Sequence, residues 1–166
     1  MTLNEAFSEQ DWQTVLLGPG RAGLAVVAAS PSGLTGVLAE LGAVGEVMRE
    51  MIATQPKTPL IEAMTEAIQT PGAANPQNRL QGRSFTEVKD EALQGVRQAM
   101  WLVRAHTTPE DVAAYRGLIL TMAQRVAEAA TEDGFLGIGG VQVSDAERAV
   151  IAEIQALVTP EDGTVG

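Results

Sequence analysis

The sequence contains no cysteine and only one histidine, His106, among its 166 residues. The absence of cysteine excludes disulfides, thiolate nucleophiles and cysteine-based zinc or iron–sulfur sites. A single histidine excludes a histidine-rich metal site within one chain, and the Glu-x-x-His pairs of ferritin-like di-iron bundles are missing. Cysteine-dependent catalysis and di-iron chemistry are therefore not predicted for this chain.

Basic residues are scarce as well. The 11 Lys and Arg residues stand against 21 Asp and Glu residues, which gives a formal net charge of −10 and a pI of about 4.5. Because binding to nucleic acid relies on Lys and Arg that displace counterions from phosphates, this balance disfavours a nucleic-acid partner. No basic region precedes an apolar run at the N-terminus, so no signal peptide is predicted and we expect a cytoplasmic protein.

Aromatic residues make up only 4% of the sequence, whereas hydrophobic residues as a whole make up 45% and charged residues 19%. This balance is typical of a globular protein and argues against a disordered chain, which combines low hydrophobicity with high net charge. A core with few aromatic rings must consist of Ala, Val, Leu, Ile and Met, which favours closely packed helices. The length fits one domain, so we predict a single helical domain over residues 1–166.

Strict alternation of apolar and polar residues, which marks strands, is nearly absent. Apolar residues instead recur at steps of three and four, as in the stripe from Val88 through Val96 to Val103. Five helix starts are marked by capping residues, namely Ser8, Thr58 before Pro59, Ser84, Thr108 and Ser144. The sequence therefore predicts an all-α bundle of about seven helices, at residues 8–17, 20–29, 32–54, 59–69, 84–106, 109–131 and 144–158.

Long hydrophobic runs are lacking, and the nearest approach to one is Ala22–Ala39, a stretch of 18 uncharged residues. Ser30–Gly33 interrupts it and much of the rest is Ala and Gly, so we predict a buried hairpin or homo-oligomer contact and no membrane span. Small residues at Gly36, Gly42 and Gly45 would allow another helix to approach closely. Residues 70–83 are predicted to form a polar linker, and residues 159–166 a frayed tail.

Gly18–Gly23 has the spacing G-x-G-x-x-G, which binds dinucleotides where it follows a strand and opens a helix. No series of further strands accompanies it, so the sequence favours a Gly-Pro break between two helices over a nucleotide site. His106 ends a predicted helix, where its interaction with the helix dipole is favoured over a catalytic role. No G-x-S-x-G motif is present to indicate a serine hydrolase.

Two acids flank the glycine-rich segment 134–140, with Asp133 before it and Glu147 after it. Carboxylates that converge across a flexible loop suit a hard cation such as Ca²⁺ or Mg²⁺, which prefers oxygen ligands. In the alternative interpretation the two acids only cap helices on either side of a flexible connection. The spacing alone favours capping, because the ligand periodicity of an EF-hand is absent.

The run from Phe135 to Glu147, FLGIGGVQVSDAE, resembles a group of bacterial helical proteins to which no activity is assigned. The resemblance extends back to the segment DWQTVLLGPGRAGLAVVAASPSGL and so covers most of the chain. It implies an all-helical fold and carries no activity to this chain.

The segments Val126–Gly134, Val143–Glu147 and Ile151–Ile154 are similar, more distantly, to the TerB-like tellurite-resistance family. That resemblance implies an all-α protein associated with divalent-ion binding and stress responses, in which Asp133 and Glu147 match the acidic motif. The family also has an internal repeat, and segment 28–36 of this chain matches segment 129–137 in its small and glycine positions. The chain departs from the family in the longer connection Phe135–Gln142, and in the first of these segments, where Ser32 stands at the position that corresponds to Asp133.

Three classes of function follow. The first is a non-catalytic, stress-associated helical protein that binds a divalent cation weakly through Asp133 and Glu147. The alternative is a structural or protein-interaction module that forms a homo-oligomer. The third is an enzyme whose active site is assembled across subunits, and the sequence favours a non-enzyme over this class. No small-molecule ligand is identified by the sequence.

Overall fold

The structure is a computed structural model that describes residues 3–29, 48–55, 57–69, 84–132 and 145–159. These residues are helical with short turns, and no strand occurs among them, so the predicted all-α class is confirmed for this part of the chain. Residues 48–54 form a helical segment. The other elements are a short 3-10 helix η1 (Leu3–Ala6) and the α-helices α1 (Glu9–Ala29), α3 (Pro59–Gln69), α4 (Phe85–His106), α5 (Pro109–Glu132) and α6 (Asp145–Val158).

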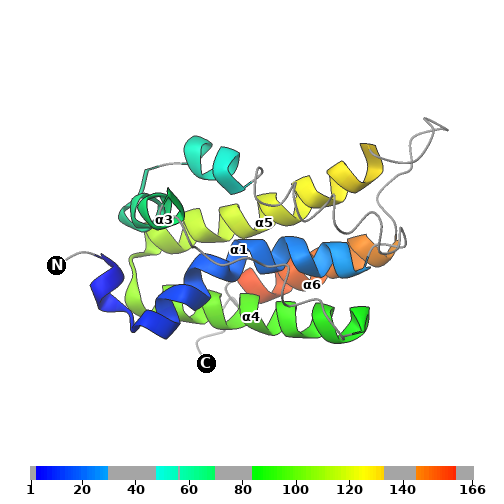
Figure 1. Ribbon diagram of the computed structural model, residues 1–166, viewed down its shortest axis with the longest axis horizontal. Coiled ribbons are helices and arrows are strands. Elements are labelled where there is room, and N and C mark those ends of the chain that lie inside the picture. The colour runs from blue at the N-terminus through cyan, green and yellow to red at the C-terminus, as the bar shows by residue number, and fades with distance from the viewer. Residues whose placement is uncertain (1–2, 30–47, 56, 70–83, 133–144, 160–166) are drawn as a thin grey trace, which may run out of the picture.

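Four long helices form the body of the fold. Helix α1 packs most extensively against α4 and next against α5, while α6 packs against all three. Figure 1 shows these helices running roughly along the long axis of the molecule, with α3 and the segment at 48–54 beside α5 at one end. Helix α3 contacts α5 and η1. This arrangement leaves one side of α4 without a neighbouring helix among the described elements.

The predicted helix starts are confirmed wherever the structure describes them. At α4 the Ser84 side chain accepts a hydrogen bond from the Glu87 amide, and the Glu87 side chain accepts one from the Ser84 amide, which is a complete capping box. At α3 the Thr58 hydroxyl accepts from the Ile61 amide over 3.3 Å. Each cap satisfies backbone donors that the first turn leaves free, and α1, α3, α4 and α5 begin within one residue of the predicted starts.

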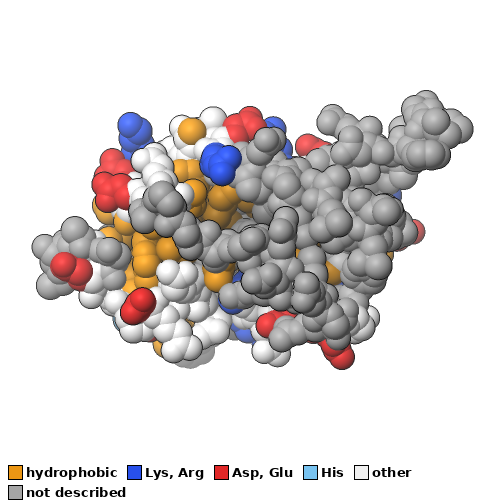
Figure 2. All heavy atoms as spheres, viewed as in Figure 1, with side chains coloured by type: hydrophobic (Ala, Val, Ile, Leu, Met, Phe, Trp, Pro, Cys, Tyr) orange, Lys and Arg blue, Asp and Glu red, His pale blue; other side chains and the backbone are white. Residues whose placement is uncertain are grey.

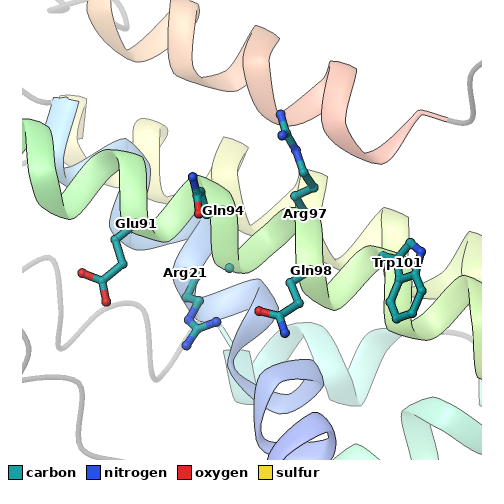
Figure 3. A pocket seen from close by; sticks show the side chains of 7 residues that line it. Arg21, Glu91, Gln94, Arg97, Gln98 and Trp101 are labelled. Atoms are coloured by element: carbon teal, nitrogen blue, oxygen red, sulfur yellow. The ribbon is translucent and has the colours of Figure 1, made fainter.

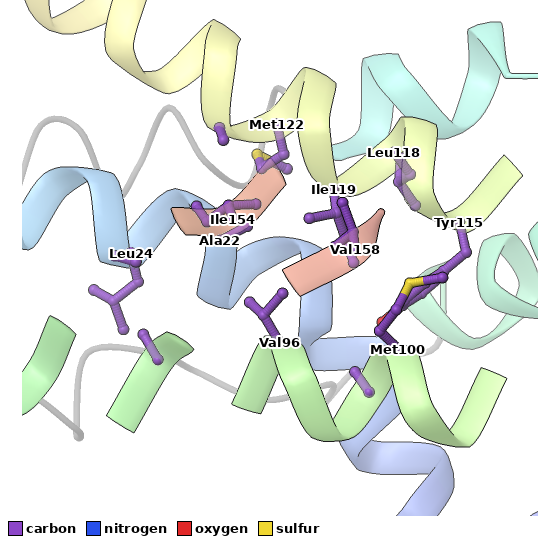
Figure 4. Packing of buried hydrophobic residues seen from close by; sticks show 14 of the residues in the cluster. Ala22, Leu24, Val96, Met100, Tyr115, Leu118, Ile119, Met122, Ile154 and Val158 are labelled. Carbon is purple, nitrogen blue, oxygen red and sulfur yellow. The ribbon is translucent and has the colours of Figure 1, made fainter. Parts of the chain in front are cut away.

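The core consists mainly of aliphatic side chains, as the scarcity of aromatic residues predicts. Figure 4 shows buried side chains of α4, α5 and α6 meeting those of α1. Those labelled there include Val96, Met100, Leu118, Met122 and Ile154, none of which is more than 1% exposed. Apolar side chains that show on the face in Figure 2 lie mostly where α1, α3 and α5 meet. Partly buried hydrophobic residues of these helices pack against the same core.

The predicted break at Gly18–Gly20 is wrong. Helix α1 continues from Glu9 to Ala29 with Pro19 inside it, so the predicted helices 8–17 and 20–29 are one helix. Proline lacks the amide hydrogen that would bond to the carbonyl four residues earlier, here that of Val15. In Figure 1 the two halves of α1 run at an angle to each other, as expected for a helix with an internal proline.

The side chain of Tyr115 on α5 replaces the missing donor. Its hydroxyl donates a hydrogen bond of 2.6 Å to the Val15 carbonyl oxygen, from a position 100 residues away in sequence. Gly18 makes room for this contact, since a Cβ atom there would overlap the Tyr115 hydroxyl and lie 2.9 Å from the Ala99 Cβ. In the Gly-Pro pair that predicts a break, Pro19 therefore leaves the Val15 carbonyl free to accept a hydrogen bond, and Gly18 leaves the space for the buried tyrosine that donates it.

Burial raises the pKa of the Tyr115 phenol well above its ordinary value, and the nearby Arg21 guanidinium lowers it by less. The unfolded phenol ionises near pH 10. The contribution of Tyr115 to stability should thus be complete below about pH 10 and decline at higher pH, by about 1.4 kcal/mol per pH unit. Urea unfolding of the wild type and of Tyr115→Phe above pH 10 measures the free energy of unfolding of each protein. This free energy should fall less steeply with pH in the variant, which has no phenol at position 115. An equal pH dependence in the two proteins would contradict the prediction.

Several predictions fall outside the described residues. These are residues 30–47 of the predicted hairpin or oligomer contact, with Gly36, Gly42 and Gly45, the linker 70–83, the glycine-rich segment 134–140 and the tail beyond Thr159. Only residues 48–54 of the predicted helix 32–54 are described, and these are helical. In the part of the chain that the structure describes, every helix is too short or too polar to cross a membrane.

Candidate functional site

Trp101 stands out on the surface of α4. Its exposed fraction is 63%, and it is the exposed large hydrophobic residue among those that the structure describes. The other tryptophan, Trp12, packs on Phe7 with ring centroids 5.6 Å apart. An isolated exposed apolar residue is ordinary in soluble proteins, so Trp101 becomes informative only through the groups around it.

Trp101 lies at one end of an open surface pocket of about 570 Å³. Figure 3 shows the side chains that line it, which come from α4 and from one residue of α1. The lining residues are Arg21, Glu91, Gln94, Gly95, Arg97, Gln98 and Trp101. Glutamines and charged groups thus surround the one large aromatic ring.

The amphipathic pattern of α4 explains why these side chains share a face. Glu91, Gln94, Gln98 and Trp101 recur at steps of three and four, the spacing that brings residues onto one side of a helix. The residues between them, such as Val96 and the other members of the apolar stripe, are buried against α1 and the core. Burial of one stripe therefore orients the polar stripe and Trp101 towards solvent.

Gly95 allows Arg21 to reach this face from α1. A Cβ atom at Gly95 would overlap the Arg21 side chain, so the absence of a side chain on α4 leaves the space that Arg21 occupies. Arg21 is half-buried, and its charge acts on the Tyr115 phenol. It follows Pro19 by two residues, so the path of α1 past this proline brings a cation to the edge of the pocket.

The electrostatic character of the pocket differs from that of the whole chain. Two arginines and one glutamate line it, whereas the chain carries a net charge of −10. Arg97 is exposed and makes no hydrogen bond or ion pair with another residue that the structure describes. In Figure 3 Arg97 points towards α6, while Arg21 and Gln98 project to the opposite edge of the α4 face. The face is thus flanked by a cation on each side.

A third arginine, Arg104 of α4, contacts the end of α6. The Arg104 guanidinium donates a hydrogen bond of 2.9 Å to the Val158 carbonyl oxygen, one of the last carbonyls of α6. A cation at a helix C-terminus is favourable for the helix dipole.

The residues that line the pocket include two arginines, one glutamate, two glutamines and one tryptophan. These side chains can bind charged, polar and apolar groups of a ligand.

The predicted cation site is described only in part. Asp133 lies outside the described residues. Glu147 lies in the first turn of α6 and is 3% exposed, and it has an interaction partner. No group of three or more metal-ligating side chains occurs among the residues that the structure describes. Binding of Ca²⁺ or Mg²⁺ by Asp133 and Glu147 stays a prediction, as does capping by these acids.

The other candidates have structural positions. His106 is the last residue of α4, and its ring lies 5.1 Å from that of Phe7, so it joins the N-terminal segment to the end of that helix. Gly18–Gly23 lies inside α1 and does not form the strand-to-helix loop that a dinucleotide site needs. The α4 face was not predicted, although the position of Trp101 beside the apolar stripe is a signal for its exposure.

Comparison with known proteins adds no relative from which a role can be transferred. The similarity to the TerB-like family therefore stays a prediction, and a function for this chain must be argued from its own surface. No protein-family model, curated protein or solved structure matches the chain.

Proposed function

We propose that the protein is a non-catalytic binding module. Its contact surface, hereafter the α1–α4 face, consists of Arg21 from α1 and the α4 residues Glu91, Gln94, Gly95, Arg97, Gln98 and Trp101. The observation that carries this proposal is Trp101, an aromatic ring left 63% exposed beside an open pocket. Tryptophan and arginine are the residue types that contribute most to binding at protein interfaces. A surface that combines both with glutamine amides offers apolar contact, charge and hydrogen bonds together.

The rigidity of its support favours this surface over other parts of the described chain. Helix α4 begins with a complete capping box and its buried stripe is packed against α1, α5 and α6. Side chains on a well-packed helix lose less conformational entropy on binding than side chains on a loop. The α1–α4 face is therefore positioned to bind without reorganisation of the backbone.

The proposal is tested by a nuclear magnetic resonance screen with small fragments of varied charge and polarity. We expect hits to shift the indole N–H signal of Trp101 and the side-chain amide signals of Gln94 and Gln98 together. Trp101→Ala should abolish these shifts, because it removes the largest contact area of the pocket. Trp12→Phe is the matched control, since Trp12 packs on Phe7 and lies outside the pocket.

Hits that cluster on another part of the molecule would contradict the proposal. So would a screen in which Trp101→Ala leaves the shifts at Gln94 and Gln98 unchanged. Cation binding by Asp133 and Glu147 is a separate hypothesis, and neither residue lines the pocket.

A further inference from the structure

We propose that the α1–α4 face binds a short, extended acidic segment of a partner protein, with a carboxylate at Arg97 and an apolar side chain on Trp101. This inference rests on the proposed function and names the class of ligand. It follows from the length of the face, from its amides and from the placement of its cations.

The length of the face suits an extended chain. Glu91 and Trp101 are ten residues apart on α4, which corresponds to about 15 Å along the helix axis at a rise of about 1.5 Å per residue. An extended segment rises about 3.3 Å per residue, so about five residues cover this distance. A compact ligand of a few atoms would contact only part of it.

The side chains along this length match the groups of a peptide. Gln94 and Gln98 lie one helical turn apart, and each offers an amide donor and a carbonyl acceptor. These groups can pair with the N–H and C=O groups of an extended backbone. The indole of Trp101 at the end of the row offers an apolar contact to a neighbouring side chain.

The cations favour acidic residues in that segment. Successive side chains of an extended chain point to opposite sides, and Arg97 and Arg21 lie at opposite edges of the α4 face in Figure 3. Arg97 is the principal contact, because it is exposed and unengaged by other described residues. Hydrogen bonds between guanidinium and carboxylate are charge-assisted and stronger than neutral ones.

Because the chain carries a net charge of −10, the acidic stretch of the partner that binds to this face must be short. Long polyanions such as nucleic acids would meet repulsion from the rest of the surface. Exposed charges separated by more than about 8 Å are largely screened at physiological ionic strength, so a segment with one or two carboxylates responds mainly to the arginines of the face. A protein segment therefore fits this surface better than a nucleic acid does.

The chain itself contains a competing acidic sequence. Glu161 and Asp162 follow α6 in sequence, and the hydrogen bond from Arg104 to Val158 places the end of α6 beside α4. The experiment must therefore separate a partner segment from the chain's own residues. A variant that ends at Thr159 removes both acids and serves this purpose.

The test measures binding of synthetic blocked peptides by the fluorescence of Trp101 in a Trp12→Phe background, where it is the one remaining tryptophan. The probe has two adjacent glutamates followed by leucine, and the matched peptides carry glutamine or lysine in place of glutamate. We expect the glutamate peptide to bind about tenfold more tightly than the glutamine peptide, as the loss of a charge-assisted hydrogen bond implies. The lysine peptide should bind most weakly.

Variants of the protein identify the contact. Arg97→Gln should weaken the glutamate peptide by about tenfold and leave the glutamine peptide unchanged, whereas Arg97→Glu should reverse the preference towards lysine. Arg148→Gln is the matched control, because it removes the same charge from an exposed position that does not line the pocket. Its affinity for all three peptides should equal that of the parent.

Equal affinity for the glutamate and glutamine peptides would contradict the inference that the ligand is acidic. In that case, fragments that shift the Trp101 signal would still support the proposed binding function. Peptide binding seen only in the variant that ends at Thr159 would also overturn the proposal, because the chain's own acidic residues would then be the occupant. If no fragment and no peptide perturbs Trp101, the proposed function fails together with the inference.

Discussion

Gly18→Ala is expected to destabilise the protein by about 2–4 kcal/mol, although alanine is the better helix former. The added Cβ would overlap the Tyr115 hydroxyl and lie 2.9 Å from the Ala99 Cβ. Overpacking of a core costs about 1–3 kcal/mol, and displacement of the phenol leaves buried polar groups without partners at about 1–3 kcal/mol. The gain in helix propensity, up to about 1 kcal/mol, offsets only part of this. Urea unfolding measures the difference.

Gly20→Ala is the matched control on the other side of Pro19. No atom lies within 4 Å of a Cβ at Gly20, so alanine is accommodated there without displacement. We expect a stabilisation of up to about 1 kcal/mol, because alanine has the higher helix propensity and reduces the entropy of the unfolded chain. Substitution by alanine should therefore lower the stability of the protein at Gly18 and raise it at Gly20, although both glycines lie in the same helix.

Tyr115→Phe provides a second check on the cause. In the background of Tyr115→Phe the hydroxyl that a Cβ at Gly18 would overlap is gone, so Gly18→Ala should cost less there than in the wild type. A double-mutant cycle measures this coupling between the two positions. Additive effects of the two substitutions would show that the absence of a side chain at Gly18 is not what makes room for the tyrosine hydroxyl.

Asp111→Ala is expected to cost about 2–4 kcal/mol, as for loss of a buried carboxylate that satisfies other polar groups. Asp111 is fully buried, and one carboxylate oxygen accepts a hydrogen bond of 3.0 Å from the Leu60 amide of α3. The other accepts one of 3.2 Å from the Thr108 hydroxyl at the start of α5. The alanine variant would leave the donors of two helix starts without acceptors. Urea unfolding is again the measurement.

Asp11→Ala is the control, because Asp11 has the same local position at the start of α1. Its carboxylate accepts a hydrogen bond of 2.8 Å from the Ser8 hydroxyl, in an exposed setting. The Ser8 hydroxyl can still accept a hydrogen bond from the backbone amide of residue 11 in this variant, so the cost should stay below the roughly 1 kcal/mol of a lost N-cap. Equal costs for Asp11→Ala and Asp111→Ala would mean that the contact with Leu60 contributes nothing beyond local capping.

The helix starts and the fold class could be predicted because their causes are local. The Ser84 capping box joins groups three residues apart, and the buried stripe of α4 repeats every three to four residues. Both patterns are visible in the sequence and do not depend on a distant partner. The ends of α3, α4, α5 and α6 accordingly lie within one residue of their predicted positions.

The candidate site could be predicted only in part. The position of Trp101 off the apolar stripe indicates exposure, but its neighbour Arg21 comes from another helix. Their proximity depends on the close approach of α1 to α4 at Gly95, which no local pattern specifies. The one site that the sequence did propose pairs Asp133 with Glu147, and of these two residues the structure describes Glu147.

The sequence by itself determined where α3, α4, α5 and α6 begin and end, to within one residue, because capping and periodicity act over a few residues. Only the tertiary structure decided that α1 continues through Pro19, since the carbonyl that proline leaves free is satisfied by Tyr115 from α5. It likewise decided that the carboxylate of Asp111, which lies in the first turn of α5, accepts a hydrogen bond from the Leu60 amide of α3, 51 residues away in sequence. In both cases a backbone group that local rules leave unsatisfied finds its partner through packing of another helix, and packing is a property of the whole fold.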